Sequence, residues 1–309
     1  MSALAAHLDD YLALRRSLGH KLDDAARLLP RFVAYLDASG AKTVSVAAAL
    51  AWAQEPQAGP GSCVRAHRMT AARGFARYLA GTDAATEVPP LGLVTYRPQR
   101  HAPYLYTEAD TALLMAEAGR HARSPLAAAS MATLIGLLAV TGMRVGEAIR
   151  LDNSDLDWAN GCVVVRETKF AKSRLLPLQP STLEALAAYQ ELRDSALLTP
   201  LTTSFLVAAK GKRLIYEHVL ETFHQLLRDS GVGAGSPNRP RLHDFRHAFA
   251  VQALTNWARA GVDVHPRLAW LATYLGHAEP RYTYLYLSAT PELLSTAVAR
   301  LETAWGGRH

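Results

Sequence analysis

The stretch TGMRVGEAIRL, Thr141–Leu151, ends a long hydrophobic helical pattern with a glycine followed closely by an arginine. Arg144 lies among apolar neighbours, and an arginine is unfavourable to bury unless its charge is paired. Glu147 follows three residues later, at a spacing that puts two side chains on one face of a helix. Alone, this stretch fits an Arg–Glu pair on a helix surface. The alternative is an arginine held in place to bind an anion.

A second stretch, RLHDFRHAFA at 241–250, combines histidines with another arginine. His243 and Arg246 are three residues apart, so in a helix they share one face. His247 is adjacent to Arg246 and is expected to point elsewhere. A His/Arg pair on one face suits an oxyanion or a phosphate, although a structural histidine explains this stretch alone equally well.

A third stretch, LGHAEPRYTYLYLSAT at 275–290, holds His277 and three tyrosines at alternate positions. In a helix, Tyr282 and Tyr286 lie on one face at a spacing of four residues, and Tyr284 points away from them. Three tyrosines so close together are usually packing residues. The alternative is that one of them is a nucleophile.

Two short apolar runs, CVVVRE and RLLPL, flank the basic segment TKFAKS and predict two strands joined by a turn. Lys169 and Lys172 lie in this turn. Turn lysines are usually solvated, but a lysine held against a phosphate ester acts as a general acid.

Taken together, these stretches supply the groups needed to attack a phosphodiester without a metal ion. Arginines form bidentate bonds to phosphate oxygens and stabilise the charge of the transition state. A tyrosine hydroxyl attacks phosphorus only when nearby groups help to remove its proton. The stretches contain no carboxylate cluster suited to binding a metal, so no cofactor is expected.

The order and spacing of these stretches resemble the tyrosine recombinase (phage integrase) family. TGMRVGEAIRL resembles the first arginine box of that family, which assigns Arg144. HDFRH matches its H-x-x-R box, which assigns His243 and Arg246, and LGH assigns His277. YLYLSATPELL is most similar to transposon- or plasmid-borne bacterial members.

Two more residues carry over from this resemblance by their spacing. The catalytic lysine of the family lies eight residues before the hairpin proline. Counting back eight residues from Pro177 selects Lys169 over Lys172. The nucleophile of the family follows the third-box histidine by nine residues, which selects Tyr286 over Tyr282 and Tyr284.

The resemblance implies a site-specific DNA recombinase that forms a 3′-phosphotyrosyl intermediate at Tyr286, without metal or ATP. It implies that Arg144, Arg246 and His277 hold the phosphate. It also implies that His243 assists proton transfer and that Lys169 protonates the leaving 5′ oxygen. The rival functions are DNA relaxation of the type IB topoisomerase kind, DNA binding by an inactive relative, and hydrolysis of RNA or nucleotides.

The expected fold is mainly α-helical with a small β-sheet, in two domains. Helical patterns and breaks predict four helices in residues 1–82, which the resemblance makes a core-binding domain of the SAM-like type. Residues 83–106 are rich in proline and predict a linker. Residues 107–309 then form the catalytic domain, with Thr107 as a helix N-cap and a C-terminal amphipathic helix.

Basic residues in the first part of the chain are candidates for DNA contact. Arg65, Arg68 and Arg73 recur along the fourth predicted helix, and Arg97 and Arg100 lie in the predicted linker. A solvated helix face is the alternative for the first three. The chain carries a formal net charge of +6, whose sign fits a polyanionic partner.

Composition predicts a cytoplasmic protein with no membrane partner. Its 309 residues include two cysteines, which offer neither a disulfide framework nor a zinc cluster. No apolar run approaches the roughly 18 residues that span a bilayer, and the N-terminus lacks a signal-peptide pattern. The resemblance implies a homotetramer on two double-stranded DNA sites with exchange of the C-terminal helix, although that helix could also dock on its own core.

Overall fold

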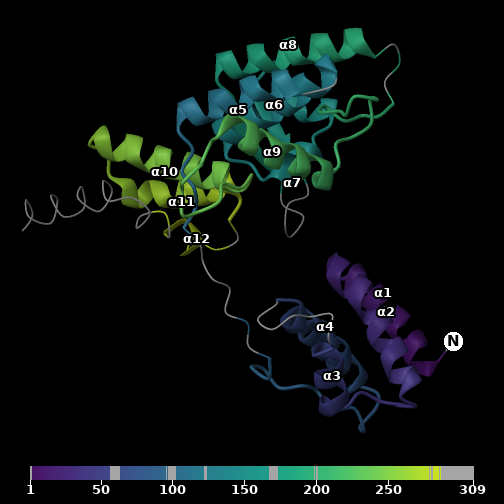
Figure 1. Cartoon of the computed structure of the whole chain (residues 1–309). Coiled ribbons are helices and arrows are strands. Elements are labelled where there is room, and N and C mark those ends of the chain that lie inside the picture. The colour runs from purple at the N-terminus through teal and green to yellow at the C-terminus, as the bar shows by residue number, and fades with distance from the viewer. Residues whose placement is uncertain are drawn as a thin grey trace, which may run out of the picture. The chain divides into compact units, whose positions relative to one another are not determined.

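A computed structural model of the chain describes residues 2–55, 63–94, 96, 102–121, 124–166, 173–197, 199, 201–277, 279, 281–284 and 286. The chain divides into two compact units, Met1–Arg100 and His101–His309. Helices dominate both units, and the second also contains a small sheet (Figure 1). The predicted fold class, mainly α with a small β-sheet in two domains, is confirmed.

The first unit contains the four helices that the sequence predicts. They are α1 (Ala3–Ser17), α2 (Asp23–Ala38), α3 (Val46–Ala53) and α4 (Cys63–Leu79). Ser2 and Ser45 cap α1 and α3 by accepting backbone N–H bonds, as short hydroxyl side chains do at N-caps. Aromatic side chains from different helices fill the core, where the ring centroids of Phe32 and Trp52 are 4.7 Å apart.

The beginning of the predicted linker is hydrogen-bonded to this first unit. The hydroxyl of Thr43 donates to Asp83 over 2.6 Å, and the backbone N–H of Glu87 donates to the carbonyl of Val44 over 2.8 Å. The division between the units falls between Arg100 and His101, inside the predicted linker.

The helices of the second unit are α5 (Glu108–His121), α6 (Pro125–Thr141), α7 (Val145–Ile149), α8 (Pro180–Ala196), α9 (Tyr216–Ser230), α10 (Asp244–Arg259), α11 (Val264–Leu275) and α12 (Arg281–Tyr284), with a short 3₁₀ helix at Asn153–Asp155. The unit is built around α6, whose buried side chains lie on several faces. Helix α6 packs against α5, α7, α8 and α10. The sequence predicted one helical pattern from Thr107 to Gly142, but the structure divides it into two helices. Ser124 caps α6, and the proline at its first position removes an N–H that would have no partner there. The predicted N-cap at Thr107 is confirmed, since its hydroxyl accepts from the N–H of Asp110 over 3.0 Å.

The sheet has three antiparallel strands in the order β1-β2-β3. The predicted hairpin is confirmed by β2 (Cys162–Val165) and β3 (Arg174–Pro177), whose buried Val163 and Leu176 are paired. Strand β1 (Leu156–Asp157) was not predicted, because two residues are too few to show an alternating pattern.

Three regions of the sequence predictions lie wholly or partly outside the described residues. They are the turn between β2 and β3, the end of the predicted linker and the predicted C-terminal helix. Within the described ranges, every helix is too short or too polar to traverse a lipid bilayer.

Candidate active site

The turn between α6 and α7 brings Arg144 into position. Gly142 ends α6 in the left-handed region at φ +60°, and its N–H donates to Leu138 over 3.0 Å. A Cβ added at Gly142 would lie 2.6 Å from Phe249 Cδ1. The backbone conformation and this close packing both require glycine here. Arg144 then occupies the N-cap of α7.

We expect Gly142→Ala to destabilise the second unit more than Gly231→Ala does. Both glycines have positive φ near +60° to +70°, so alanine introduces backbone strain of about 1 kcal/mol at either position. Gly231 has open space around it, whereas Gly142 meets Phe249 and so adds an overpacking cost of about 1–3 kcal/mol. Denaturant unfolding of the two variants measures the difference, and equal losses would contradict this packing argument.

Glu147 is the centre of a buried ion cluster. Its side chain is 3% exposed and pairs with two arginines. Arg144 Nη1 donates to Oε1 over 2.7 Å, and the backbone N–H of Arg144 donates to Oε2 over 2.9 Å. Arg174 on β3 donates to both carboxylate oxygens. Burial alone would raise the pKa of Glu147, but the bonds and charge of Arg174 and Arg144 outweigh it and lower that pKa to about 2.

This lowered pKa predicts an acid dependence of stability. A folded-state pKa of about 2 lies below the unfolded value of about 4.3, so the ionised carboxylate stabilises the fold at neutral pH. That contribution, roughly 3 kcal/mol, is complete above the unfolded pKa and is lost as the pH falls toward 2. Glu147→Gln should therefore flatten the pH dependence of the unfolding free energy between pH 4.5 and 2. Denaturant titrations at stepped pH test this, and an unchanged slope would contradict it.

Arg246 on α10 is almost fully enclosed, with 2% of its surface exposed. Its Nη1 donates to the carbonyl of Gly142 over 3.0 Å, and its Nη2 donates to the carbonyl of Leu275. Burial and the nearby charge of Arg144 lower its pKa to about 10. Arg246 therefore stays cationic at neutral pH and ties the α6–α7 turn to the end of α11.

His277 follows the αL glycine that ends α11 and faces the same cluster. Its Nδ1 lies 2.7 Å from the hydroxyl of Thr283, which fixes the orientation of the ring. Burial and the positive charges of Arg246 and Arg144 lower its pKa to about 4. The imidazole is therefore neutral at neutral pH and able to donate one hydrogen bond and accept another.

Tyr286 is buried against this cluster, with 5% of its surface exposed. The ring centroids of His277 and His247 lie 6.2 Å and 5.4 Å from its own. Burial raises its pKa, and the charge and hydrogen bond of Arg246, together with the charge of Arg144, act in the opposite direction. The phenol is thus protonated at neutral pH but lies beside two cations.

Tyr284 and Tyr286 have different surroundings, as the predicted helical spacing requires. Tyr284 is 48% exposed, whereas Tyr286 is buried. The side chain of Tyr282 lies outside the described residues, as does the whole of Lys169.

His243 and His247 lie one turn apart at the start of α10, with ring centroids 5.0 Å apart. His243 is exposed on one side, yet the protein atoms around its ring and the neighbouring His247 and Arg246 lower its pKa. The prediction that His247 points elsewhere is wrong, because its ring meets Tyr286 edge-on. His247 Nδ1 is buried and has no hydrogen-bond partner in the part of the chain that the structure describes.

Five of the six residues predicted as catalytic therefore meet in one place, and the sixth is not described. The sequence did not single out Arg174 or Thr283, and it misplaced His247. Arg174 begins a strand one hundred residues before its carbonyl partner Tyr274, so no local pattern connects them. Thr283 contacts His277 through its hydroxyl, and a single threonine six residues after a histidine has no distinctive sequence pattern.

The predicted DNA-contact arginines of α4 differ in their surroundings. Arg68 is 5% exposed, donates to the carbonyl of Trp52 over 3.1 Å and pairs with Glu55. Arg68 is therefore engaged inside the first unit, a placement that does not fit a residue that contacts DNA. Arg73 binds the carbonyls of Pro89 and Pro90, and Arg65 is partly exposed. The other two predicted contacts, Arg97 and Arg100, lie outside the described residues.

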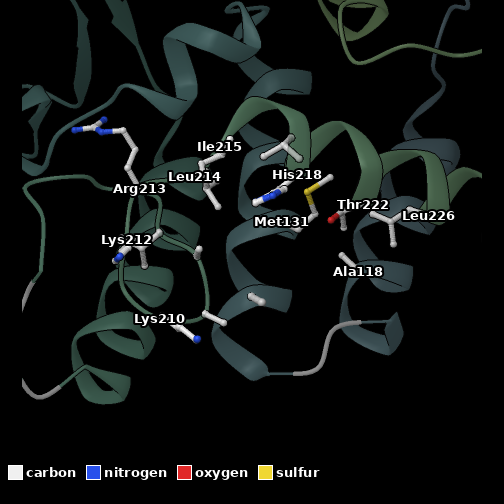
Figure 2. A pocket seen from close by; sticks show the side chains of 15 residues that line it. Ala118, Met131, Lys210, Lys212, Arg213, Leu214, Ile215, His218, Thr222 and Leu226 are labelled. Carbon is white, nitrogen blue, oxygen red and sulfur yellow. The ribbon is translucent and has the colours of Figure 1, made fainter.

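A separate cavity of ≈ 480 Å³ lies between α5, α6, α9 and the loop at 207–215 (Figure 2). Its lining is mostly apolar, with Met131 and Leu226 on the helices and Lys210 and Lys212 on the loop. None of the five described catalytic candidates lines it. In the described residues, no three His, Cys, Asp or Glu side chains are grouped to hold a metal ion.

Comparison with known proteins decides the family. A sequence profile described as "Phage integrase family" matches residues 106–292, more than half of the chain. The chain belongs to the phage integrase family. It is thus a tyrosine-type site-specific DNA recombinase by family, as the arginine and histidine boxes predicted.

Similar proteins cover most or all of this recombinase. A provisionally named integrase/recombinase of Sinorhizobium fredii, y4rB, is 38% identical over 314 residues, with 100% of each chain covered. Tyrosine recombinase XerD of Mycobacterium tuberculosis is 31% identical over 248 residues, covering 79% of this chain and 70% of XerD. The Tn1549 transposon integrase, solved with transposon right end DNA, shares the fold with a TM-score of 0.63 at 18% identity, covering 96% of this chain and 99% of that one. The predicted resemblance to transposon- or plasmid-borne members fits these matches.

Proposed function

We propose that this recombinase cuts and rejoins duplex DNA through a 3′-phosphotyrosyl intermediate at Tyr286. The observation that carries the proposal is the convergence of Arg144, Arg246 and His277 on this one buried tyrosine. Two arginines beside a phenol supply the charge stabilisation that phosphoryl transfer requires. Tyr284 is exposed, and none of the contacts described for the two arginines involves it.

In the proposed cleavage step, the Tyr286 oxygen forms a bond to phosphorus and the bond from phosphorus to the 5′ oxygen breaks. Arg144 and Arg246 bind the non-bridging oxygens, and His277 donates a further hydrogen bond to the phosphate. The neutral imidazole of His243 assists removal of the phenolic proton. Lys169, by resemblance to the family, gives a proton to the leaving 5′ oxygen.

Resealing reverses these steps with the 5′-hydroxyl of a partner strand. The phosphotyrosyl bond conserves the energy of the phosphodiester, so the proposed cycle requires neither ATP nor a metal ion. Solved relatives include a XerH recombinase bound to difH substrate in a pre-cleavage complex, which supports DNA as the partner.

The proposal extends to the organisation of the protein on DNA. Residues 1–82 serve as the core-binding domain, residues 83–106 as the linker and residues 107–309 as the catalytic domain. Arg65 and Arg73 are the remaining described candidates for DNA contact in the first unit, with Arg97 and Arg100 in the linker. Four chains assemble on two sites and exchange their C-terminal helices.

A covalent capture experiment tests this function. Purified protein is incubated with a library of randomised nicked duplexes, in which the short 5′-hydroxyl fragment diffuses away after cleavage. DNA that stays attached through SDS and is released by protease is then sequenced. The proposal expects enrichment of one sequence in the attached pool. Release of free cleaved DNA with no attached pool would instead indicate a hydrolase.

A further inference from the structure

Arg174 is the less exposed of the two arginines that pair with Glu147, and it has no assigned role in the proposed reaction. Its side chain is 10% exposed and lies at the start of β3. Nη1 and Nη2 donate to the two oxygens of Glu147 over 3.2 Å and 2.6 Å. Arg174 therefore forms a bidentate pair, the geometry in which a guanidinium binds a carboxylate most strongly.

Arg144 is left with a single side-chain bond to the same carboxylate. Its Nη1 donates to Oε1 over 2.7 Å, and its Nη2 donates to the carbonyl of Gly276 over 3.2 Å. A guanidinium has five N–H donors, and these two bonds leave its side chain 35% exposed. The exposed part of the fork is the part available to a phosphate.

The two arginines compete for one carboxylate. If Arg174 were absent, both oxygens of a buried anion would be open to Arg144, and a bidentate pair would turn its fork toward Glu147. We infer that Arg174 is a positioning residue that occupies the bidentate face of Glu147 and thereby keeps Arg144 directed at the scissile phosphate. This inference rests on the proposed function of the site.

Arg174 also fixes the segment that precedes His277. Its Nε donates to the carbonyl of Tyr274 over 2.8 Å. Its guanidinium packs against Gly276 so closely that an added Cβ there would lie 2.9 Å from Nη1. Gly276 supplies the carbonyl that accepts from Arg144 Nη2. Arg174 therefore contacts both groups that bind the Arg144 side chain, Glu147 and Gly276.

The first test measures single-turnover cleavage of the selected nicked duplex by Arg174→Gln. We expect the cleavage rate constant to fall about 10²-fold, because the oriented charge of Arg144 is lost from the transition state. DNA affinity should change less than about threefold, since Arg144 is one of many phosphate contacts. Arg174→Lys should recover little, because an ammonium cannot occupy both oxygens in a planar fork.

The second test separates positioning from loss of folded protein. A methylphosphonate at the scissile position removes one negative charge, so its cleavage depends less on the cations around it. We expect the ratio of wild-type to Arg174→Gln rates to shrink from about 10² to under about 10 on this substrate. Partial unfolding would lower both rates equally, and an unchanged ratio would overturn the inference.

A double variant tests the competition itself. Glu147→Gln removes the carboxylate charge that would attract the Arg144 fork. Arg174→Gln should therefore lower the cleavage rate much less in that background than it does alone. Additive losses would overturn the inference. A wild-type protein that forms no covalent adduct would instead remove the proposed function, whereas normal adduct with normal Arg174→Gln rates would remove only the role of Arg174.

Discussion

Tyr286→Phe will eliminate the SDS-resistant protein–DNA complex, and Tyr284→Phe will leave it intact. The expected loss for Tyr286→Phe is about 10⁴-fold or more, because phenylalanine has no oxygen to form the bond to phosphorus. Formation of the complex on the selected nicked duplex, followed by denaturing gel electrophoresis, measures both variants.

The burial of Tyr286 is the physical reason for this contrast. Its ring contacts the imidazoles of His277 and His247, and its hydroxyl interacts with Arg246. Burial raises the pKa of this phenol, and the positive charges of Arg246 and Arg144 oppose that rise and favour loss of the proton as the oxygen attacks. Tyr284 is only two residues away in the sequence, but it is 48% exposed and is not buried against these cations.

The matched pair also controls for binding. Phenylalanine preserves the ring that packs against the histidines, so Tyr286→Phe should bind the duplex with near wild-type affinity in a gel-shift assay. Adduct retained by Tyr286→Phe and lost in Tyr284→Phe would reverse the assignment. Loss in both variants would indicate that the segment as a whole, and not one hydroxyl, is required.

The sequence predicts the helices and the hairpin because each carries its own periodic pattern. It also predicts Arg144, Arg246, His277 and Tyr286 as one site, but only because the family resemblance connects stretches that lie far apart. The burial of Arg246 could not be predicted from local spacing, because the carbonyls that bind its guanidinium come from two distant turns.

The errors of the sequence predictions have physical causes. Arg68 follows the helical spacing of Arg65 and Arg73, which are partly exposed, yet its own side chain is buried and bonds to the carbonyl of Trp52 and to Glu55. His247 follows Arg246 by one residue, and neighbouring helical residues point about 100° apart. That spacing does not set the position of Tyr286, which belongs to another segment and whose ring centroid lies 5.4 Å from that of His247. Tertiary contacts of this kind have no signature in local spacing.

Arg246→Lys is the second replacement with a large expected effect. We expect the rate of cleavage of the selected duplex to fall about 10²–10³-fold, even though the lysine side chain can also carry a positive charge. The guanidinium of Arg246 binds the carbonyls of Gly142 and Leu275 while it faces Tyr286. A single ammonium group cannot hold both carbonyls and a phosphate with the same geometry.

The pH dependence of this loss distinguishes charge from geometry. Burial and the charge of Arg144 lower the pKa of Arg246 only to about 10, so the wild-type residue stays cationic up to pH 9. The same environment lowers the pKa of a lysine, which begins from a lower value and loses its proton within the assay range.

The deficit of Arg246→Lys relative to wild type should therefore grow between pH 6.5 and 9. Arg259→Lys serves as the control, because Arg259 lies in the last turn of the same helix and is exposed. A deficit that stays constant with pH would mean that the lysine remains charged, and that the fork geometry of Arg246 alone accounts for the loss. Equal activity of Arg246→Lys and Arg259→Lys would contradict the assignment of Arg246 to the phosphate site.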